Sequence, residues 1–374
     1  MIKILHCADI HLDSPFASEN AIKAEVRRNE LRGTFTSMMM YAKKNGADIV
    51  LIAGDLYDNE FVTKETVSLI IREFENNPDC RFIISPGNHD IYTVNSVYSR
   101  TNFPENVYIF NTDVLSYFSF EDINTDVYGY AFVRREMQKN PFAGLLPQNH
   151  NAINLLCAHG DMLLGEKDCC PIKVNEIETS GFDYVALGHI HNSTGIEKTG
   201  NVYYAYSGCP EGRDYGETGY KGALWLEIDK GNVKAKELRF SKRRYESEKL
   251  NITGASSMTD VISNLRKLVT DQKYADDTAL RVQFEGDVAP SLIISPSMLR
   301  EQFKTLFELE VIDKTMPIYD YSYLENDPTI RGAFFEKIMP IFRNGSPEEQ
   351  NIAARALRYG LSAISGNDIA DFEL

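Results

Sequence analysis

Five short motifs within the first 191 residues of this 374-residue chain hold five of its seven histidines. Each motif closes an apolar run of the kind that forms a β-strand: IKILHCADIH, DIVLIAGDLYD, RFIISPGNHD, INLLCAHG and FDYVALGHIH. In open α/β sheets, sites form at the carboxyl ends of the strands. The motifs therefore predict one metal centre, assembled from loops on one rim of a sheet. Its candidate ligands are two Asp, one Asn and four or five His: Asp9, His11, Asp55, Asn88, His159, His189 and His191, with His89 as the possible fifth histidine.

The residue types indicate which ions this centre would take. Neutral imidazole and carboxylate together suit Mn, Fe, Zn or Co. Seven donors are too many for one tetrahedral ion, and they suit two ions that share a bridging carboxylate. Two metal ions about 3.5–4 Å apart are the usual arrangement for in-line displacement at phosphorus. The donor set thus favours a hydrolase that cleaves phosphate esters.

The order of the motifs resembles a known family. D-x-H at 9–11, GDxxD at 54–58, GNHD at 87–90, H-G at 159–160 and GHxH at 188–191 are similar to the calcineurin-like metallophosphoesterases. The opening KILHCADIHLDSPF, with GDLYD and GHIH, resembles the SbcD and YhaO branch of bacterial DNA-repair exonucleases. The resemblance covers roughly residues 1–225. It implies an α/β (α+β) fold, a β-sandwich of two mixed sheets flanked by helices.

The resemblance also implies how the donors are shared between the two ions. The first ion would be held by Asp9, His11 and His191. The bridging carboxylate would be Asp55, and the second ion would be held by Asn88, His159 and His189. Mn²⁺ is the metal favoured by the resemblance, with Fe or Zn as alternatives.

Three further residues of the motifs are catalytic candidates by the same resemblance. His89 would act on the phosphate as a transition-state stabiliser or leaving-group acid, without binding metal. Asp90 would orient the other ring nitrogen of His89. Several relatives have histidine at the position of Asp58, so we expect Asp58 to be a weaker helper behind the ligands. His6, within the first strand, and His150, in a loop, are predicted to be structural.

Composition is ordinary for a soluble globular protein, with 43% hydrophobic and 25% charged residues. No apolar run is long enough to span a membrane, and the N-terminus reads as a strand and not as a signal peptide. The six cysteines are scattered and form no CxxC pair, which fits a reducing cytoplasm. We therefore expect a cytoplasmic protein without membrane contact.

The net charge of −15 argues against unaided DNA binding, because phosphate neutralisation by basic residues supplies most of the affinity for DNA. Basic residues cluster only locally, at 27–32, 134–135 and 234–244. Each cluster taken alone is more typical of a solvated helix or strand edge. Either these clusters line a groove beside the site, or a partner supplies most of the DNA contact.

The pattern of periodicity predicts three parts. Residues 1–244 contain the motifs, with helices at 22–45 and 63–76, and form the metallophosphoesterase domain. Residues 245–324 read as a small α+β module, which caps the active site and shapes the DNA groove in the resembled nucleases. A dimerisation or stability role is the alternative. Residues 325–374 read as a helical tail with an apolar stripe, which either packs against this chain's own cap or docks an ATPase, since relatives hold their ATPase there. The stripe consists of Ile352, Ala356, Leu357, Tyr359, Gly360, Leu361 and Ile364.

Three functions follow as hypotheses. The first is a dimetal exonuclease that acts on DNA in repair with an SMC/Rad-type ATPase, with a homodimer left open. The second is a small-molecule phosphatase or cyclic-nucleotide phosphodiesterase that uses the same two ions. The third is a non-catalytic scaffold. The additional α+β module favours the nuclease, the acidic charge favours the second hypothesis, and the complete ligand set argues against the scaffold.

Overall fold

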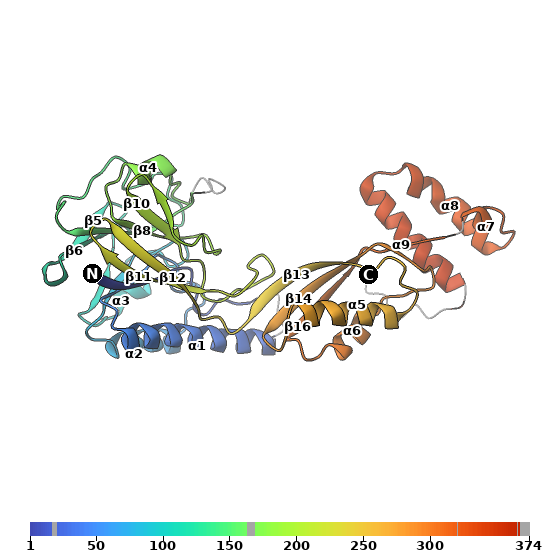
Figure 1. Cartoon of the computed structure of the whole chain (residues 1–374), viewed down its shortest axis with the longest axis horizontal. Coiled ribbons are helices and arrows are strands. Elements are labelled where there is room, and N and C mark those ends of the chain that lie inside the picture. The colour runs from blue at the N-terminus through green and yellow to red at the C-terminus, as the bar shows by residue number, and fades with distance from the viewer. Residues whose placement is uncertain (17–20, 163–168, 320, 365, 367–374) are drawn as a thin grey trace. The chain divides into compact units, whose positions relative to one another are not determined.

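The structure is a computed structural model that describes residues 1–16, 21–162, 169–319, 321–364 and 366 (Figure 1). The chain forms two compact units, residues 1–244 and 245–374. The last part of the predicted tail, residues 365 and 367–374, lies outside the described residues. Each unit is built around its own buried apolar residues and is described by itself.

The first unit contains two six-stranded mixed sheets. The first sheet has the order β12-β11-β1-β2-β3-β4, in which β1 to β4 run parallel and β11 is antiparallel to both β1 and β12. Its strands are β1 (Ile2–Cys7), β2 (Ile49–Ile52), β3 (Arg81–Ile84), β4 (Val107–Ile109), β11 (Gly222–Asp229) and β12 (Asn232–Arg239). A hairpin at Lys230 and Gly231 joins β11 to β12, and Gly231 has the positive φ that its turn requires.

The second sheet has the order β5-β6-β7-β8-β10-β9, in which β6, β7, β8 and β10 run parallel. Its strands are β5 (Ser116–Phe120), β6 (Thr125–Gly129), β7 (Ile153–His159), β8 (Tyr184–Gly188), β9 (Glu197–Thr199) and β10 (Val202–Tyr206). One buried cluster contains Ile4 and Leu51 of the first sheet together with Leu155 and Ala186 of the second. The two sheets therefore pack face to face, which confirms the predicted sandwich of mixed sheets.

Helices cover the outer face of the first sheet. In α1 (Ala21–Asn45), Leu31, Phe35, Met38 and Ala42 recur at three- and four-residue spacing, and they are buried against that sheet. Helix α2 (Lys64–Glu75) begins at the cap Thr63, whose side-chain oxygen accepts from the Thr66 amide. The short elements α3 (Val97–Arg100), η1 (Glu121–Ile123) and α4 (Val174–Glu178) complete the unit.

The second unit begins with a three-stranded sheet of order β13-β14-β16. Helices α5 (Met258–Asp271) and α6 (Pro296–Gln302) share a buried cluster with its strands. The strands are β13 (Arg244–Asn251), β14 (Thr278–Glu285) and β16 (Glu308–Asp313), and a two-stranded ladder pairs β15 (Asp287–Val288) with β17 (Met316–Pro317). Helices α5 and α6 are capped by Ser257 and Ser295, whose hydroxyl groups accept hydrogen bonds from backbone amides in the first turn.

Three helices follow, α7 (Tyr321–Glu325), α8 (Ile330–Asn344) and α9 (Pro347–Ile364), of which α7 was not predicted from the sequence. Leu357 and Leu361 of the predicted stripe are buried against Phe335 and Met339 of α8. Arg358 donates to Asp313 and Thr315, so α9 is also tied to the end of β16. Part of the stripe therefore packs within this unit, whereas Ile352 is exposed.

Candidate metal centre

The seven predicted ligands converge at the carboxyl ends of five parallel strands. β1, β2 and β3 of the first sheet end before Asp9, Asp55 and Asn88, respectively. In the second sheet β7 ends at His159, and β8 ends immediately before His189. The first two loops are joined by backbone hydrogen bonds, from the Asp9 amide to Gly54 at 3.1 Å and from the His11 amide to Asp55 at 2.9 Å. Both sheets therefore contribute to one rim.

Three side chains form the first half of the centre. The Nε2 atoms of His11 and His191 lie 3.4 Å apart, and Asp9 Oδ1 lies 4.0 Å from His191 Nε2. Asp9 and His11 are almost fully buried, and His191 is partly open to solvent. These three residues are the set predicted to hold the first ion.

The second half lies around His159. Its Nε2 atom is 2.9 Å from Asn88 Oδ1 and 3.5 Å from Asp55 Oδ2, and the ring centroid of His189 is 5.3 Å from that of His159. The same Asp55 oxygen lies 3.6 Å from His11 Nε2 in the first half. Asp55 thus stands between the two halves, where a bridging carboxylate would be.

The ligand histidines are suited to binding metal ions through Nε2, because the other ring nitrogen of each, Nδ1, faces a hydrogen-bond acceptor. The Nδ1 atoms of His11, His159 and His191 lie 2.7 Å from Asp58, 2.9 Å from the Ala53 carbonyl and 2.5 Å from Glu217. Each of these oxygens accepts, which favours a proton on each Nδ1 and a lone pair on each Nε2; the Arg213 guanidinium, a donor, also lies 3.0 Å from His191 Nδ1. Lone pairs facing one another at 3.4 Å, beside two buried carboxylates, would repel without a cation between them.

The pKa values of the two central carboxyl groups reflect this burial. Burial, opposed by His191 and reinforced by the nearby charge of Asp55, raises the pKa of Asp9 to about 7. Burial also acts to raise the pKa of Asp55, but His159, His11 and His89 hold it down to about 2. Two carboxylates this close are stabilised together only by positive charge, which bound cations would supply.

The backbone at the centre is strained. Asp9, His11, Asp55 and His189 all have positive φ values, between 49° and 101°. Residues other than glycine rarely adopt this region, and such conformations persist where the surrounding structure enforces them and the site uses them. Here the strain turns four of the predicted ligands toward one point.

Glycines allow the loops to approach one another closely. A Cβ atom on Gly87 would lie 2.3 Å from Asp55 Oδ1, and one on Gly54 would lie 2.1 Å from His159 Nδ1. A Cβ atom on Gly188 would lie 1.8 Å from the Ala53 carbonyl oxygen. Any larger residue at these positions would push the donor side chains apart.

His89 is placed beside the centre and is more open than the ligands. Its side chain is 52% exposed, and its Nδ1 atom lies 3.3 Å from Asp58 Oδ1, the oxygen that also accepts from His11. The hydrogen bond to Asp58 raises the pKa of His89 above its ordinary value. Asp58 therefore connects a predicted ligand with the predicted catalytic histidine, although the sequence indicated only a weak helper.

The expected role of Asp90 is wrong in the structure, because Asp58 and not Asp90 contacts the His89 ring. Asp90 is fully buried and accepts from the backbone amides of Asp55, Leu56 and Gly87 and from the Tyr98 hydroxyl, at 2.5–3.1 Å. Its carboxylate ties the GDLYD loop to the GNHD loop. Asp90 organises the loops that present Asp55 and Asn88.

Two residues of the centre were missed by the sequence analysis. Glu217 accepts from His191 and, through Oε2, from the Arg213 amide at 2.7 Å. The Arg213 guanidinium lies 3.3 Å from Glu217, and its charge acts on Asp9, His11 and His89. Both residues lie in the loop after β10, where no motif flanks them. The PEGRDYGE run of charges was the only available signal.

The first basic cluster of the sequence supports this loop. Arg27 is fully buried in α1 and forms an ion pair with Glu211 at 3.1 Å and a hydrogen bond to the Gly212 carbonyl. Arg32 forms an ion pair with Asp13 at 2.5 Å. The solvated interpretation of this cluster is therefore wrong for Arg27, which fixes the segment that precedes Arg213.

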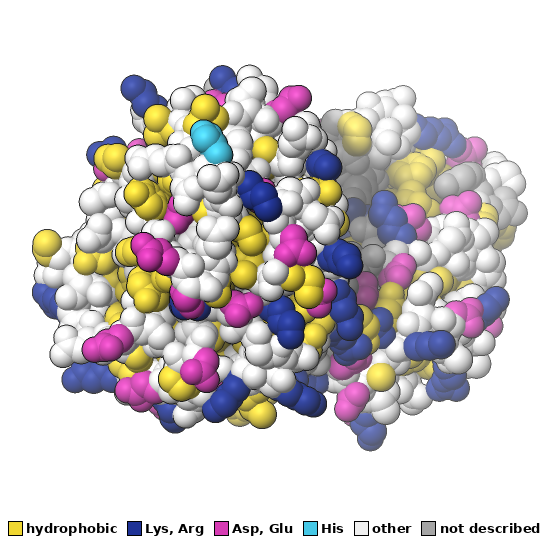
Figure 2. Space-filling view, turned by 60° about the vertical axis from the view of Figure 1, so that its left-hand side comes forward, with side chains coloured by type: hydrophobic (Ala, Val, Ile, Leu, Met, Phe, Trp, Pro, Cys, Tyr) yellow, Lys and Arg dark blue, Asp and Glu magenta, His cyan; other side chains and the backbone are white. Residues whose placement is uncertain are grey.

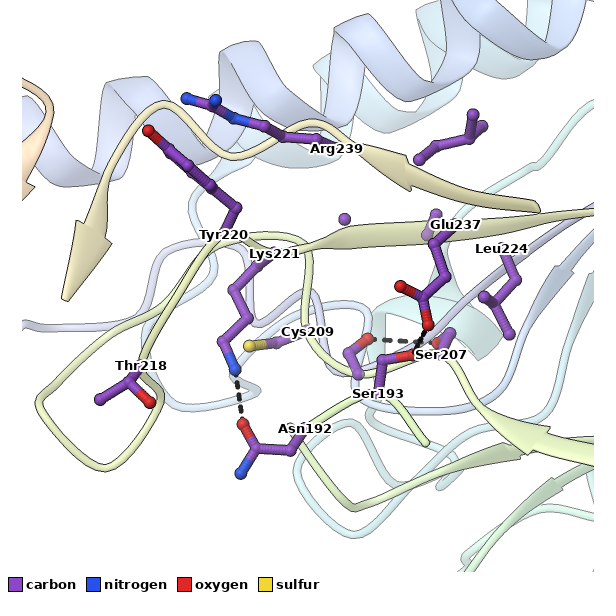
Figure 3. Close-up of a pocket in the computed structure, with 14 residues that line it drawn as sticks. Asn192, Ser193, Ser207, Cys209, Thr218, Tyr220, Lys221, Leu224, Glu237 and Arg239 are labelled. Atoms are coloured by element: carbon purple, nitrogen blue, oxygen red, sulfur yellow. Dashed lines mark hydrogen bonds between the residues drawn. The ribbon is translucent and has the colours of Figure 1, made fainter. Parts of the chain in front are cut away.

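A cavity of about 480 Å³ begins at the residues that follow His191 (Figure 3). Its lining includes Ser207, Tyr220 and Glu237, and the nearly buried Lys221 donates to Asn192 at 2.5 Å across it. None of the ten predicted site residues lines it. The cavity therefore shares no lining residue with the predicted site. Its nearest point along the chain is Asn192, which follows the predicted ligand His191.

Comparisons with known proteins agree with this site. The chain is 26% identical over 319 residues to the metallophosphoesterase YhaO of Bacillus subtilis (strain 168), covering 81% of this chain and 76% of YhaO. It is 24% identical to the SbcD component of the SbcCD nuclease of Staphylococcus epidermidis, covering 62% of this chain and 67% of that protein. It is also 24% identical to the DNA double-strand break repair protein Mre11 of Saccharolobus solfataricus, covering 62% and 61%.

No helix in the described ranges is long and apolar enough to cross a membrane.

The family model for calcineurin-like phosphoesterases matches residues 2–193, just over half of the chain, and these residues contain all five motifs. With buried His and Asp groups of the dimetal type at the sheet rim, the chain is a hydrolase that belongs to the calcineurin-like phosphoesterases.

Proposed function

We propose that this phosphoesterase is a metal-dependent DNA exonuclease that acts in repair together with an SMC-type ATPase. The observation that carries the proposal is the similarity to two proteins, one named as part of a nuclease and one as a double-strand break repair protein. Each of these matches spans 62% of the chain and is therefore longer than the family match. The similarity to these two proteins thus extends over more of the chain than the family model matches.

In this proposal Asp9, His11 and His191 hold one ion, Asn88, His159 and His189 hold the other, and Asp55 bridges. We propose Mn²⁺, with Fe or Zn as alternatives. The chemistry that two such ions supply when bound is activation of a water and stabilisation of negative charge on phosphate.

The chain's own residues complete the reaction on the leaving-group side. Because Asp58 accepts from His89 Nδ1, the Nε2 atom of His89 is the one left to face the substrate. The hydrogen bond to Asp58 raises the pKa of His89, which favours the protonated form that a leaving-group acid requires. We therefore assign protonation of the leaving oxygen to His89 and the orientation of its ring to Asp58.

The charge of the chain supports a partner that shares the DNA contact. Acidic and basic side chains are interspersed on the face shown in Figure 2, and the net charge is −15. DNA affinity depends mainly on clustered positive charge. In the tail helices, Ile330, Ile341 and Ile352 remain exposed. We propose that they bind the ATPase and that residues 245–324 contribute to DNA binding.

The acidic charge also supports a second candidate function. A small-molecule phosphatase or cyclic-nucleotide phosphodiesterase needs no extended basic surface, and the same dimetal site would serve it. The two functions differ in whether polymeric DNA is cleaved.

One experiment separates them. The purified chain, supplied with Mn²⁺, is assayed on linear duplex DNA, on single-stranded DNA and on bis(p-nitrophenyl) phosphate, with and without a co-purified partner. We expect cleavage of DNA from its ends together with ester hydrolysis, and loss of both in Asp55→Ala. Ester hydrolysis without any DNA cleavage, partner included, would reject the nuclease in favour of the second candidate.

A further inference from the structure

A cavity of about 300 Å³ opens beside His89. Asn88 and His89 of the GNHD loop form one part of its lining, and Asn59 and Glu60, which follow Asp58, form another. The rest consists of Ile91, Thr93, Asn95, Ser96 and Arg135. Because His89 is the residue assigned to the leaving oxygen, this cavity lies where the group that departs from phosphorus would be.

The lining of this His89 cavity is polar and able to form hydrogen bonds. Asn59, Thr93 and Asn95 provide amide and hydroxyl groups, and the single apolar residue of the lining is Ile91. Binding sites for drug-sized ligands begin at about 300 Å³. The cavity is thus at the small end of that range, suited to one nucleoside.

A pair of opposite charges stands at the cavity. The Arg135 guanidinium forms an ion pair with Glu60, and both side chains are mostly exposed, Arg135 at 70%. An exposed ion pair of this kind contributes little stability, because water screens it and two long side chains lose freedom. A phosphate binds guanidinium through two parallel hydrogen bonds and is the stronger partner. Arg135 can therefore exchange Glu60 for a phosphate with little loss.

The neighbouring arginine offers a built-in comparison. Arg134 is also 70% exposed and also pairs with a carboxylate, Asp113, at 3.6 Å, but it does not line the cavity. The two residues thus share type, exposure and general charge and differ in their position relative to the cavity. Any effect specific to Arg135 must come from that position.

We propose that the His89 cavity binds the nucleoside on the leaving-group side of the scissile phosphate, and that Arg135 binds the next phosphate of the strand in place of Glu60. The inference rests on the proposed function and deepens it, because it assigns a subsite for a ligand with two phosphates. A substrate with a single phosphate would leave Arg135 paired with Glu60.

The test measures binding, so that it does not depend on turnover. Thymidine 3′,5′-bisphosphate and the two thymidine monophosphates are titrated calorimetrically into the Mn²⁺-loaded protein. We expect the bisphosphate to bind about tenfold more tightly than either monophosphate, the size expected of one hydrogen-bonded charge pair at a partly exposed site. Arg135→Ala should reduce that ratio to near one.

Two further variants fix the sign of the effect. Glu60→Gln removes the competing carboxylate, so the preference for the bisphosphate should increase by a few-fold. Arg134→Ala is the matched control and should leave the preference as in the wild type. If Arg135→Ala and Arg134→Ala reduce bisphosphate affinity equally, the effect is general charge and the subsite assignment is wrong.

The outcomes separate this inference from the proposed function. A wild-type protein that prefers the bisphosphate but cleaves no DNA would retain the subsite and reject the nuclease. A protein that cleaves DNA but binds all three nucleotides equally would retain the nuclease and reject the subsite.

Discussion

Glu217 makes the sharpest prediction about the centre, because it contacts His191 and none of the other predicted ligands in the hydrogen bonds described. Its Oε1 atom lies 2.5 Å from His191 Nδ1, so it fixes both the tautomer and the ring plane. Loss of such a partner typically weakens metal binding about 10- to 100-fold, which is about 1.4–2.8 kcal/mol. Glu217→Gln keeps an acceptor oxygen and loses only its charge, so we expect the tenfold end. Glu217→Ala loses the acceptor too, so we expect about 100-fold.

The measurement is a calorimetric titration of Mn²⁺ into chelator-stripped protein, fitted to two sites. Only the ion held by His191 should bind more weakly, because His159 and Asn88 are oriented by other groups. Glu237→Gln is the control, since this exposed acid contacts Ser193 and not His191. If both sites weaken equally in a folded Glu217→Ala protein, or if neither changes, the orientation argument is refuted.

Four other predictions test different parts of the molecule. His89→Ala should retain two ions by elemental analysis but lower turnover by about 10²–10⁴; loss of an ion would make His89 a ligand. Asp90→Ala leaves four buried hydrogen-bond donors without their acceptor and should lower the free energy of unfolding by about 3 kcal/mol or more in urea titrations. An unchanged urea midpoint would contradict this. Burial lowers the pKa of His6 to about 3, below its value of 6.5 in the unfolded chain, so stability is lost as pH falls below 6.5. Unfolding at pH 7.5 and 5 should show about 2 kcal/mol less pH dependence in His6→Phe, and equal dependence in both proteins would refute it. Ile341→Asp with Ile352→Asp should abolish pull-down of the ATPase without changing Tm, because both side chains are exposed; retained binding would exclude this surface.

Most secondary structure of the first unit could be predicted because its determinants are local. Helix 22–45 corresponds to α1 (Ala21–Asn45), with the apolar spacing on its buried face and Gly46, at φ 65°, just after its end. The five motif strands could be predicted from short apolar runs that end in ligand-type residues. The convergence of the ligands could also be predicted, because the carboxyl ends of parallel strands lie along one rim of a sheet.

The parts that escaped prediction depend on contacts between distant segments. Glu217 follows His191 by 26 residues, and no periodicity marks its loop, so only the folded chain shows their contact. Asp90 was assigned to His89 because the two are neighbours in sequence. Its carboxylate is instead used by amides 34 and 35 residues away, those of Leu56 and Asp55. Arg27 was missed because an arginine on a helix is usually solvated, whereas Glu211 neutralises it inside the unit.

The loops that present the donors are held by hydrogen bonds within the protein. Each strained residue donates its backbone amide to an acceptor: Asp9 to the Gly54 carbonyl, His11 to the Asp55 carbonyl, Asp55 to the Asp90 carboxylate, and His189 to the Asp9 carboxylate. A non-glycine residue in the left-handed region costs about 1–2 kcal/mol, which these buried hydrogen bonds offset. His89, by contrast, has Asp58 and the His11 ring beside its own ring and stays half exposed, which suits a group that must meet a substrate.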